Sequence, residues 1–568
     1  MQTLKKSIAF KHMDAFAMVA WSIVVAFLVL LFRDSLPLLS LLVKIVTSLL
    51  VLTIGTHHAY RNGWNRRCIF YAVLLCLILL LIINSVTNFI YHTLMMETTL
   101  NYLFSVALRV LSQMACFICI LLNYKKNVSL HKLFLIAGLL IGCSYMLLIT
   151  PLSVPDENYH YNSSYLVSNY LLFKNDKHEA TKKHVNYDGF MVHDNVSSAY
   201  GRFTDGVFLT QKDLEETDRI EERYSLDYPI QHVPQAIGVS IARLCRLNFV
   251  GVFYLGRLFN LLFYLLCTYF AVKCIPYFKG ALFVIGLLPM SMQQAASLSS
   301  DSFINGLSFL IIAITCKLIM TEKQIDYKEK IAIITCIILL SPVKVIYYLL
   351  AAMLFIIPAE RYHNTKERII FILTAIGSGI IAILLTRLNA LAIMTQQHTS
   401  VDTWNNERYY SISDFIADPR SAVDIFLKSF DMNVISYFET MLGSELSGFT
   451  IILPSWIVFL LAISFLMNAI KQPNDCYVFR GRDRAFICFI IICVVVLVMT
   501  SMLLGWTTID YDYIVGVQGR YFIPIALLVV LALRNNTICS TVNLNEYLLT
   551  ILFATHYFIA ANIIEYTF

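Results

Sequence analysis

Charged residues are scarce in this chain of 568 residues: Asp, Glu, Lys and Arg together make up 14%, whereas 58% of the residues are hydrophobic and the mean hydropathy is +0.69. So apolar a composition excludes an ordinary soluble protein. Most of the length consists of apolar runs of roughly 18 to 24 residues, each long enough as a helix to cross a bilayer. Because the runs lack the alternating pattern of a membrane barrel, they predict an all-α, polytopic bundle of transmembrane helices.

Cysteine is absent from the two long polar segments, 151–232 and 388–450, and the 14 cysteines lie largely inside apolar runs. This distribution argues against a disulfide framework and against a CxxC-type zinc site. The basic residues are spread over short connecting segments, so the net charge of +6 indicates no nucleic-acid partner. Internal repeats and low-complexity segments are also lacking, which disfavours a transporter built from inverted halves.

The apolar runs divide the chain into three parts. We expect an N-terminal module of four spans (1–131), a core (132–534) with outer loops 151–248 and 387–450, and a C-terminal span within 535–568. The run at 15–33 follows Lys5, Lys6 and Lys11 with no cleavage site, which predicts a retained span rather than a signal peptide. The runs at 331–341 and 344–358 meet at Pro342, so they are expected to form a kinked pair. The predicted spans are 15–33, 36–56, 69–90, 99–122, 132–150, 249–272, 280–297, 302–320, 331–341, 344–358, 368–386, 451–470, 485–505, 521–534 and 546–564.

The distribution of Lys and Arg predicts the orientation, because short cytoplasmic loops carry the positive excess. With a cytoplasmic N-terminus the predicted inner loops are basic, whereas the turns at 91–98 and 298–301 carry no Lys or Arg. We therefore expect a multi-pass cell-membrane protein whose two long loops lie outside. The turns at Asp301, at Pro342 and at Gln518-Gly519-Arg520 are expected on the same outer face.

An acidic pair stands directly after the fifth predicted span. Asp156 and Glu157 follow Pro155, and His160 comes one helical turn later, on the same face as Asp156. We expect the segment from Pro155 to residue 172 to form an amphipathic helix lying along the surface. Carboxylates there could deprotonate a hydroxyl group or hold a divalent cation, with Mg²⁺ or Mn²⁺ as the cofactor candidates. The alternative is that Asp156 and Glu157 only cap the first turn of a helix.

A second polar group lies in 228-YPIQHVPQAIG-238, where two prolines and a glycine bracket Gln231, His232 and Gln235. Together with Tyr228, these side chains could bind a sugar from a rigid turn. An ordinary junction between a loop and a helix explains the same pattern and, without further context, explains it better.

Ionisable residues within or next to the spans carry the third signal. Arg257 lies about one-third of the way into a predicted span. Lys344, Asp301 and Arg520 stand at the outer ends of predicted spans. Phosphate recognition needs such groups, because Arg offers paired donors and Lys a point charge.

Read in order, 154-VPDENYHY-161, 228-YPIQHVPQAIG-238, 256-GRLFN-260, 289-PMSMQQAASLSSDSF-303, Lys344 after a proline and 517-VQGRYFIP-524 resemble a family of bacterial multi-spanning membrane proteins in the GT-C glycosyltransferase superfamily. The resemblance covers roughly 132–534. It implies a GT-C fold, an acidic loop motif for acceptor or metal, and a sugar donor carried on a polyprenyl phosphate. Two departures stand out: four extra spans precede the motif, and the acidic motif is the adjacent pair Asp156-Glu157 rather than Asp-x-Asp.

These observations combine into one expected reaction. The outer face of a cell membrane lacks nucleotide sugars, so a transferase there needs a lipid-linked donor, here a polyprenyl-phosphate sugar, and an extracytoplasmic glycan acceptor. We expect Asp156 as general base, Glu157 as its orienting or metal-binding partner and His160 in contact with substrate. Lys344, Arg520 and Arg257 would stabilise the departing phosphate. The alternatives are a flippase or transporter of a lipid-linked saccharide, and a polysaccharide polymerase or ligase.

Overall fold

The computed structural model describes residues 51, 53–54, 66–95, 100–125, 128–176, 181–184, 215–218, 220, 229–397 and 408–567. The predicted span at 15–33 and nearly all of that at 36–56 lie outside the described residues. Within the described part, seven helices are long and apolar enough to cross a membrane: Phe104–Lys125, Leu130–Leu148, Phe249–Cys274, Asp301–Met320, Thr365–Thr386, Gly481–Gly505 and Asn545–Tyr566. The chain is therefore a multi-pass, helical membrane protein, as its composition predicts.

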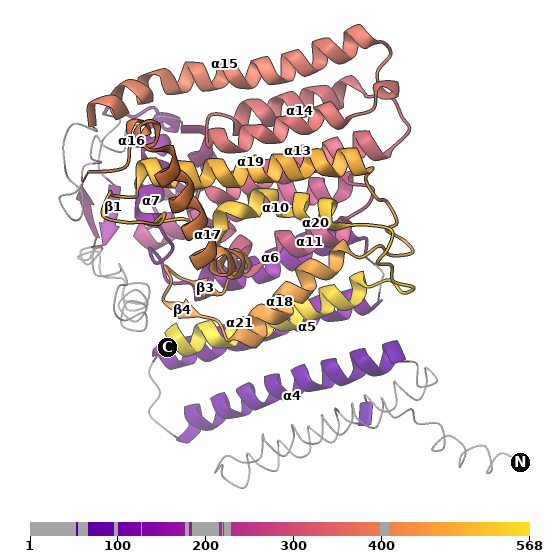
Figure 1. Cartoon of the computed structure of the whole chain (residues 1–568). Coiled ribbons are helices and arrows are strands. Elements are labelled where there is room, and N and C mark those ends of the chain that lie inside the picture. The colour runs from indigo at the N-terminus through magenta and orange to yellow at the C-terminus, as the bar shows by residue number, and fades with distance from the viewer. Residues whose placement is uncertain are drawn as a thin grey trace, which may run out of the picture.

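The first described helices pack against the last one. Helix α4 (Arg66–Met95) contacts α5 (Leu100–Lys125), and α5 in turn packs against α6 (Leu130–Leu148) and α21 (Asn545–Thr567). Figure 1 shows α4, α5 and α21 at the lower edge of the bundle. An ion pair of 2.9 Å between Arg67 and Glu546 joins α4 to α21.

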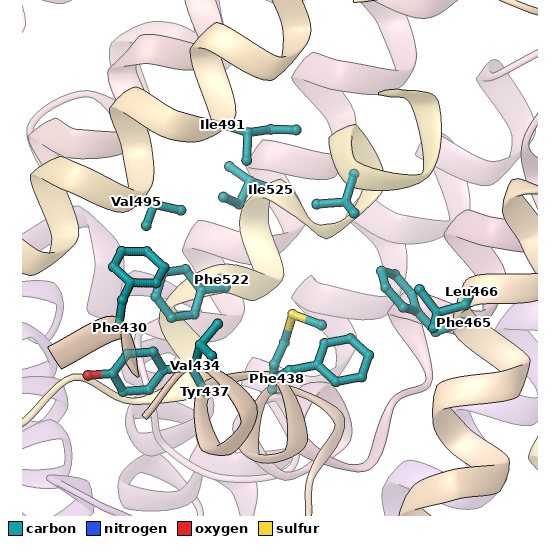
Figure 2. Close-up of a pocket in the computed structure, with 12 residues that line it drawn as sticks. Phe430, Val434, Tyr437, Phe438, Phe465, Leu466, Ile491, Val495, Phe522 and Ile525 are labelled. Atoms are coloured by element: carbon teal, nitrogen blue, oxygen red, sulfur yellow. The ribbon is translucent and has the colours of Figure 1, made fainter. Parts of the chain in front are cut away.

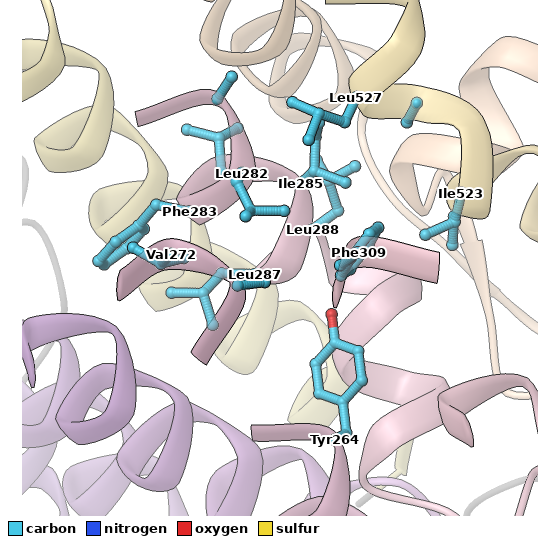
Figure 3. Close-up of a cluster of buried hydrophobic side chains, with 14 of the residues drawn as sticks. Tyr264, Val272, Leu282, Phe283, Ile285, Leu287, Leu288, Phe309, Ile523 and Leu527 are labelled. Atoms are coloured by element: carbon cyan, nitrogen blue, oxygen red, sulfur yellow. The ribbon is translucent and has the colours of Figure 1, made fainter. Parts of the chain in front are cut away.

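The centre of the bundle is formed by α10 (Phe249–Cys274), which packs against α6, α9 and α13 (Asp301–Met320). The predicted span 280–297 is not continuous. It is divided into α11 (Lys279–Gly286) and α12 (Pro289–Ala295), because Pro289 lacks the N–H that a continuous helix needs. Both short helices are buried, and Figure 3 shows α11 side chains packed against those of Tyr264, Phe309 and Leu527.

The predicted break at Pro342 is confirmed, since α14 (Tyr327–Leu340) ends just before it. The next twelve residues do not resume an α-helix but form a 3-10 helix, η6 (Val345–Ile356). A second 3-10 turn, η7 (Ala359–Arg361), leads to α15 (Thr365–Gln397). Lys344 thus stands at the beginning of η6, where the chain re-enters the bundle.

The described part of the second predicted outer loop, 387–450, is largely helical. Helix α15 extends into it, and α16 (Ile412–Ala417) and the 24-residue α17 (Pro419–Leu442) follow. The remaining elements are β3 (Glu445–Leu446), β4 (Ile451–Ile452), α18 (Ser455–Leu466), η8 (Met467–Ala469), α19 (Gly481–Gly505), η9 (Gly519–Phe522) and α20 (Ile523–Leu533).

The first predicted outer loop contributes α7 (Glu157–Leu171), β1 (Thr181–His184), β2 (Glu215–Asp218), η5 (Pro229–His232) and α9 (Val233–Leu244). Strands β1 and β2 pair antiparallel. In Figure 1, α7, β1, α16 and α17 gather at the left end of the bundle. The expectation that α7 lies along the surface is wrong: most of its residues are buried. The helix packs against α9, where Ser168 bonds to Ser240 at 2.9 Å.

Candidate functional site

The turn between α6 and α7 places two neighbouring carboxylates in different surroundings. Asp156 has a φ of 63°, a left-handed conformation that asparagine and aspartate tolerate better than most residues. This backbone conformation directly precedes the first residue of α7, Glu157. Asp156 keeps 64% of its side chain exposed, whereas the Glu157 side chain is fully buried.

Glu157 forms a buried ion pair with Arg257 of α10. Two guanidinium nitrogens of Arg257 donate to the two carboxylate oxygens at 2.7 and 2.8 Å. The other Arg257 donors bond to backbone carbonyls at the end of α6 and just after it, those of Met146, Ile149 and Thr150. Glu157 also accepts the backbone N–H groups of Leu152 and Leu298. Every polar atom of this pair is thus engaged, so the pair holds α7, α10 and the turn before α13 together.

A charged cluster, made of Asp156, Asp301, Lys344 and Arg520, forms where the first residues of α7, α13, η6 and η9 meet. Arg520 donates to Asp156 at 3.0 Å and lies 3.5 Å from Asp301. Lys344 lies 3.5 Å from the other carboxylate oxygen of Asp301. Four segments separated by up to 364 positions therefore bring two carboxylates and two cations into contact. This meeting of acidic loop and distant cations is the geometry that the expected reaction requires.

The two cations of the cluster differ in accessibility. The side chain of Arg520 is only 5% exposed, whereas that of Lys344 is 35% exposed. The ring of Tyr521 lies beside both, at 4.2 Å from the Lys344 ammonium group and 5.3 Å from the Arg520 guanidinium carbon. Such contacts attract the cationic groups to the face of the ring and orient them. Lys344 is thus the cation that an incoming anion reaches first.

Two histidines adjoin the cluster. The rings of His160 on α7 and His232 on η5 are buried with their centroids 5.3 Å apart. Burial lowers the pKa of His160 to about 4, although the carboxylates of Asp156 and Asp301 act in the opposite direction. Burial also lowers the pKa of His232 well below its ordinary value. Both imidazoles are therefore neutral near pH 7, and each can donate one hydrogen bond and accept another.

The second predicted loop closes over the first. Ser447 bonds to Ser153 at 2.6 Å through the two hydroxyls, and its backbone N–H donates to Gln293 of α12 at 2.7 Å. Next to it, Gly448 has a φ of 64° and lies so close to the Ser153 carbonyl that a Cβ atom would approach to 2.7 Å. A cleft of about 10 Å³, room for roughly one water, remains between this loop, α12 and η9.

Gln518 and Gly519 complete the wall of that cleft beside Arg520. Gly519 is packed directly on α17, since a Cβ atom there would lie 2.1 Å from the Met441 nitrogen and 2.4 Å from the Tyr437 oxygen. Its N–H donates to the Thr440 hydroxyl at 3.2 Å. The close approach that only glycine permits thus sets the position of Arg520.

The remaining sequence candidates lie apart from the charged cluster or serve the fold. Gln235 is buried and donates to the carbonyls of Leu298 and Ser299, so it ties α9 to the turn before α13. Gln231 is partly exposed on η5. Tyr228 lies outside the described residues.

The donor set does not fit the Mg²⁺ or Mn²⁺ ion considered from the sequence. Such ions need several free oxygen ligands in near-octahedral geometry. Both Glu157 oxygens are taken by Arg257 and backbone N–H groups, and Arg520 stands between Asp156 and Asp301. Across the described ranges, no three His, Cys, Asp or Glu side chains lie together as a metal centre requires.

An apolar cavity of about 290 Å³, here called the first groove, opens beside η9. Figure 2 shows Phe430, Val434 and Tyr437 of α17 facing Phe522 and the side chains of α19. The full lining is Phe430, Val434, Tyr437, Phe438, Met441, Phe465, Leu466, Ile491, Val495, Phe522, Ile525 and Val529. Because Phe522 is two residues from Arg520, the groove adjoins the charged cluster.

Comparison with known proteins identifies the family. Residues 139–529, more than half of the chain, match the family described as predicted membrane protein (DUF2142). The chain belongs to the DUF2142 family. The matched residues of this DUF2142 protein include α7, η6, η9 and all four members of the charged cluster. No curated protein and no solved structure matches the chain.

Sequence reasoning missed the partners that shape the site. Tyr521 contacts both cations, and Gln293 bonds to Ser447 in the loop beside the cluster. Tyr521 and Gln293 stand in the quoted motifs but were not named as site residues, and Ser447 stands in a loop without a distinctive pattern. One signal could have found Tyr521, because it directly follows Arg520 in the sequence. For Ser447 only the packing of the two loops could reveal the contact.

Proposed function

We propose that this DUF2142 protein is a GT-C-type glycosyltransferase that moves a sugar from a polyprenyl-phosphate donor to an extracytoplasmic glycan. The observation that carries the proposal is the charged cluster, in which an exposed carboxylate lies 3.0 Å from a buried Arg520 beside an accessible Lys344. A reaction that deprotonates a hydroxyl group and releases a phosphate needs these groups within one site. The end of the bundle that carries the cluster would face the outside of the cell.

The chemistry assigns one role to each member of the cluster. Asp156 takes the proton of the acceptor hydroxyl, whose oxygen forms a bond to the anomeric carbon of the donor. The bond between that carbon and the phosphate oxygen breaks, and the electron pair leaves with the phosphate. Lys344 and Arg520 stabilise the negative charge on this leaving group, and Asp301 holds the two cations together. A single displacement of this kind inverts the anomeric centre.

The first groove supports a lipid as the carrier of the donor sugar. Apart from the Tyr437 hydroxyl its wall is apolar, and transfer of an isoprenoid chain from water into such a groove is favourable. One wall residue, Phe522, lies two positions from Arg520 in the chain, so a lipid in the groove would bring its phosphate to the cations. Glu157 and Arg257, fully engaged with each other and with backbone, are left to position α7 rather than to react.

Replacement of Asp156 with Asn tests the proposal. The amide oxygen can still accept from Arg520, so the protein should fold, whereas transfer should fall by about 10² to 10⁴-fold because the base is lost. Transfer is measured as radiolabelled sugar moved from a polyprenyl-phosphate donor in membranes, with thermal unfolding of the purified variant as the check on folding.

The matched control is Asp424→Asn, because Asp424 is exposed on α17 away from the cluster. This control should transfer sugar as the wild type does. Full activity in the Asp156→Asn variant would remove Asp156 as the base. If cells lacking the gene keep every sugar substituent of their envelope glycans, the transferase proposal itself is overturned.

A flippase of lipid-linked saccharide is the second candidate, and one observation favours it. Along α13, Asn305, Ser308 and Thr315 lie on the same face as Asp301, one to four turns further on. Their side chains are buried, and both Asn305 polar atoms and the two hydroxyls lack a hydrogen-bond partner. Unpaired polar groups in this position are what a path for a headgroup through the bundle would supply.

The two candidates are separable with Asn305→Leu. A flippase requires the polar face, so this variant should lose translocation of a fluorescent lipid-linked saccharide across liposomes. The transferase places its chemistry in the charged cluster, so transfer should persist.

A further inference from the structure

A second apolar groove is lined by a different set of helices from the first. Its cavity of about 480 Å³ is formed by η5, α9, α10, α13 and α14, none of which lines the first groove. Phe259 and Leu266 mark its extent along α10, a distance of roughly 10 Å at 1.5 Å per residue. The length and apolar wall fit part of a lipid chain.

The charged cluster connects the two grooves. In the first groove, Phe522 follows Arg520 by two residues. The second groove approaches the cluster through two histidines: His232 stands between its wall residues Ile230 and Val233, and the His232 ring lies 5.3 Å from that of His160, one helical turn after Asp156. Asp301 and Arg520 lie 3.5 Å apart. Two lipids with their chains in the two grooves would therefore bring their headgroups to one place.

Unpaired polar atoms lie beside the second groove. Ile230 and Val233 line it, and His232 between them is buried with both ring nitrogens lacking a hydrogen-bond partner. The Nδ1 atom of His160 lacks one as well. A buried polar group left unpaired costs about 1–3 kcal/mol, so these atoms favour a ligand that brings hydroxyl groups. Uncharged imidazoles suit the hydroxyls of a sugar.

Both cations of the cluster are available to an anionic headgroup. Arg520 and Lys344 contact the same carboxylate, Asp301, and lie beside the same ring, Tyr521. The cluster thus supplies two positive charges at the place where the headgroups of two anionic lipids would meet.

We propose that the second groove binds the acceptor, and that the acceptor is a glycan carried on an anionic lipid rather than a soluble polymer or a protein. The first groove then holds the donor lipid, and His232 with His160 contacts hydroxyl groups of the acceptor sugar. This inference rests on the proposed transferase function, and it selects one class among the possible acceptors.

The binding experiment uses the full chain in phosphatidylcholine nanodiscs and a diazirine-bearing farnesyl phosphate as the probe. Tryptophan is introduced at apolar positions that are at least partly exposed: Ile237 in the second groove, Val434 in the first and Ile381 on α15 as the control. Cross-linked peptides should come from both grooves. Ile237→Trp should reduce labelling of the second groove at least tenfold and leave the first unchanged, Val434→Trp should do the reverse, and Ile381→Trp should change neither.

A diazirine-bearing phosphatidylcholine is the comparison probe. The proposal is overturned if this zwitterionic lipid labels the second groove as strongly as farnesyl phosphate does, or if labelling by farnesyl phosphate persists in Ile237→Trp. Either result would mean that bulk bilayer lipid fills the groove.

His232→Leu adds a second measurement. It should leave thermal stability equal or higher, since an unpaired polar group is removed, while raising the KM for acceptor at least tenfold; a loss of stability with unchanged KM would assign His232 to the fold alone.

The transfer experiment separates this inference from the proposed function. Radiolabelled sugar from a polyprenyl-phosphate donor, incubated with whole membranes, should be recovered in the organic-solvent extract that holds lipid-linked glycans. Label recovered only in water-soluble polymer or protein would overturn the lipid-linked acceptor and keep the transferase. No transfer to any fraction would overturn the transferase, and the cross-linking result would still decide whether the groove binds an anionic lipid.

Discussion

The buried pair of Glu157 and Arg257 permits a quantitative test of its positioning role. In Glu157→Gln the amide group replaces one carboxylate oxygen, and its N–H donors face donors of Arg257 and of the backbone. Two hydrogen bonds to the carboxylate are lost, one from Arg257 and one from a backbone N–H, each worth about 1.5–3 kcal/mol. The Arg257 charge then stays buried without a counterion. Breaking such a pair generally costs about 3–5 kcal/mol, and we expect a destabilisation of that size.

The assay is thermal unfolding of the purified protein in detergent, followed by intrinsic fluorescence. The matched control is Glu329→Gln, which removes a partly exposed pair with Lys317 at 2.6 Å. This exposed pair should contribute less than about 1 kcal/mol. If Glu157→Gln unfolds at the wild-type temperature yet abolishes transfer, Glu157 belongs to the reacting groups and its assignment to positioning α7 is refuted.

Two further predictions concern stability at the site. The pKa of His160 in the folded state, about 4, lies below its ordinary value of 6.5, so the folded state binds fewer protons than the unfolded state. The free energy of unfolding should therefore fall by up to about 3 kcal/mol as the pH drops from 6.5 toward 4. His160→Asn should flatten this pH dependence in thermal unfolding and the exposed His363→Asn should not; equal slopes in both variants would contradict it. Gly519→Ala should destabilise by about 1–3 kcal/mol and reduce transfer, because its Cβ would meet backbone atoms of α17 and displace Arg520. The control Gly377→Ala has open space around its Cβ, and a Gly519→Ala protein as stable and active as this control would show that the close approach is dispensable.

The composition and the motifs predicted the membrane class and part of the site. Long apolar runs need no tertiary information to be recognised as helices, because the bilayer forces every backbone polar group to be satisfied within the segment. Pro342 marked a real break, because a residue without an N–H cannot continue a helix. Asp156, Asp301, Lys344 and Arg520 were recognised as candidates because charged residues within or beside membrane spans usually serve a function.

The sequence did not distinguish the two halves of the acidic pair. Asp156 and Glu157 are adjacent and chemically alike. The left-handed backbone at Asp156 nevertheless directs its carboxylate to the charged cluster, while the Glu157 carboxylate pairs with Arg257 of α10. Likewise, Pro289 divided a run that composition alone had presented as one span, and α7 became buried against α9, where Ser240 bonds to Ser168.

Hydropathy alone assigned this chain to the bilayer, since it is a sum over residues and needs no knowledge of contacts. Which charges meet depends instead on how the helices pack. Asp156 and Arg520 are 364 positions apart, and their contact depends on how α7, α13 and η9 pack, including a glycine that lets η9 approach α17. Such contacts are properties of packing geometry, which local residue patterns do not encode.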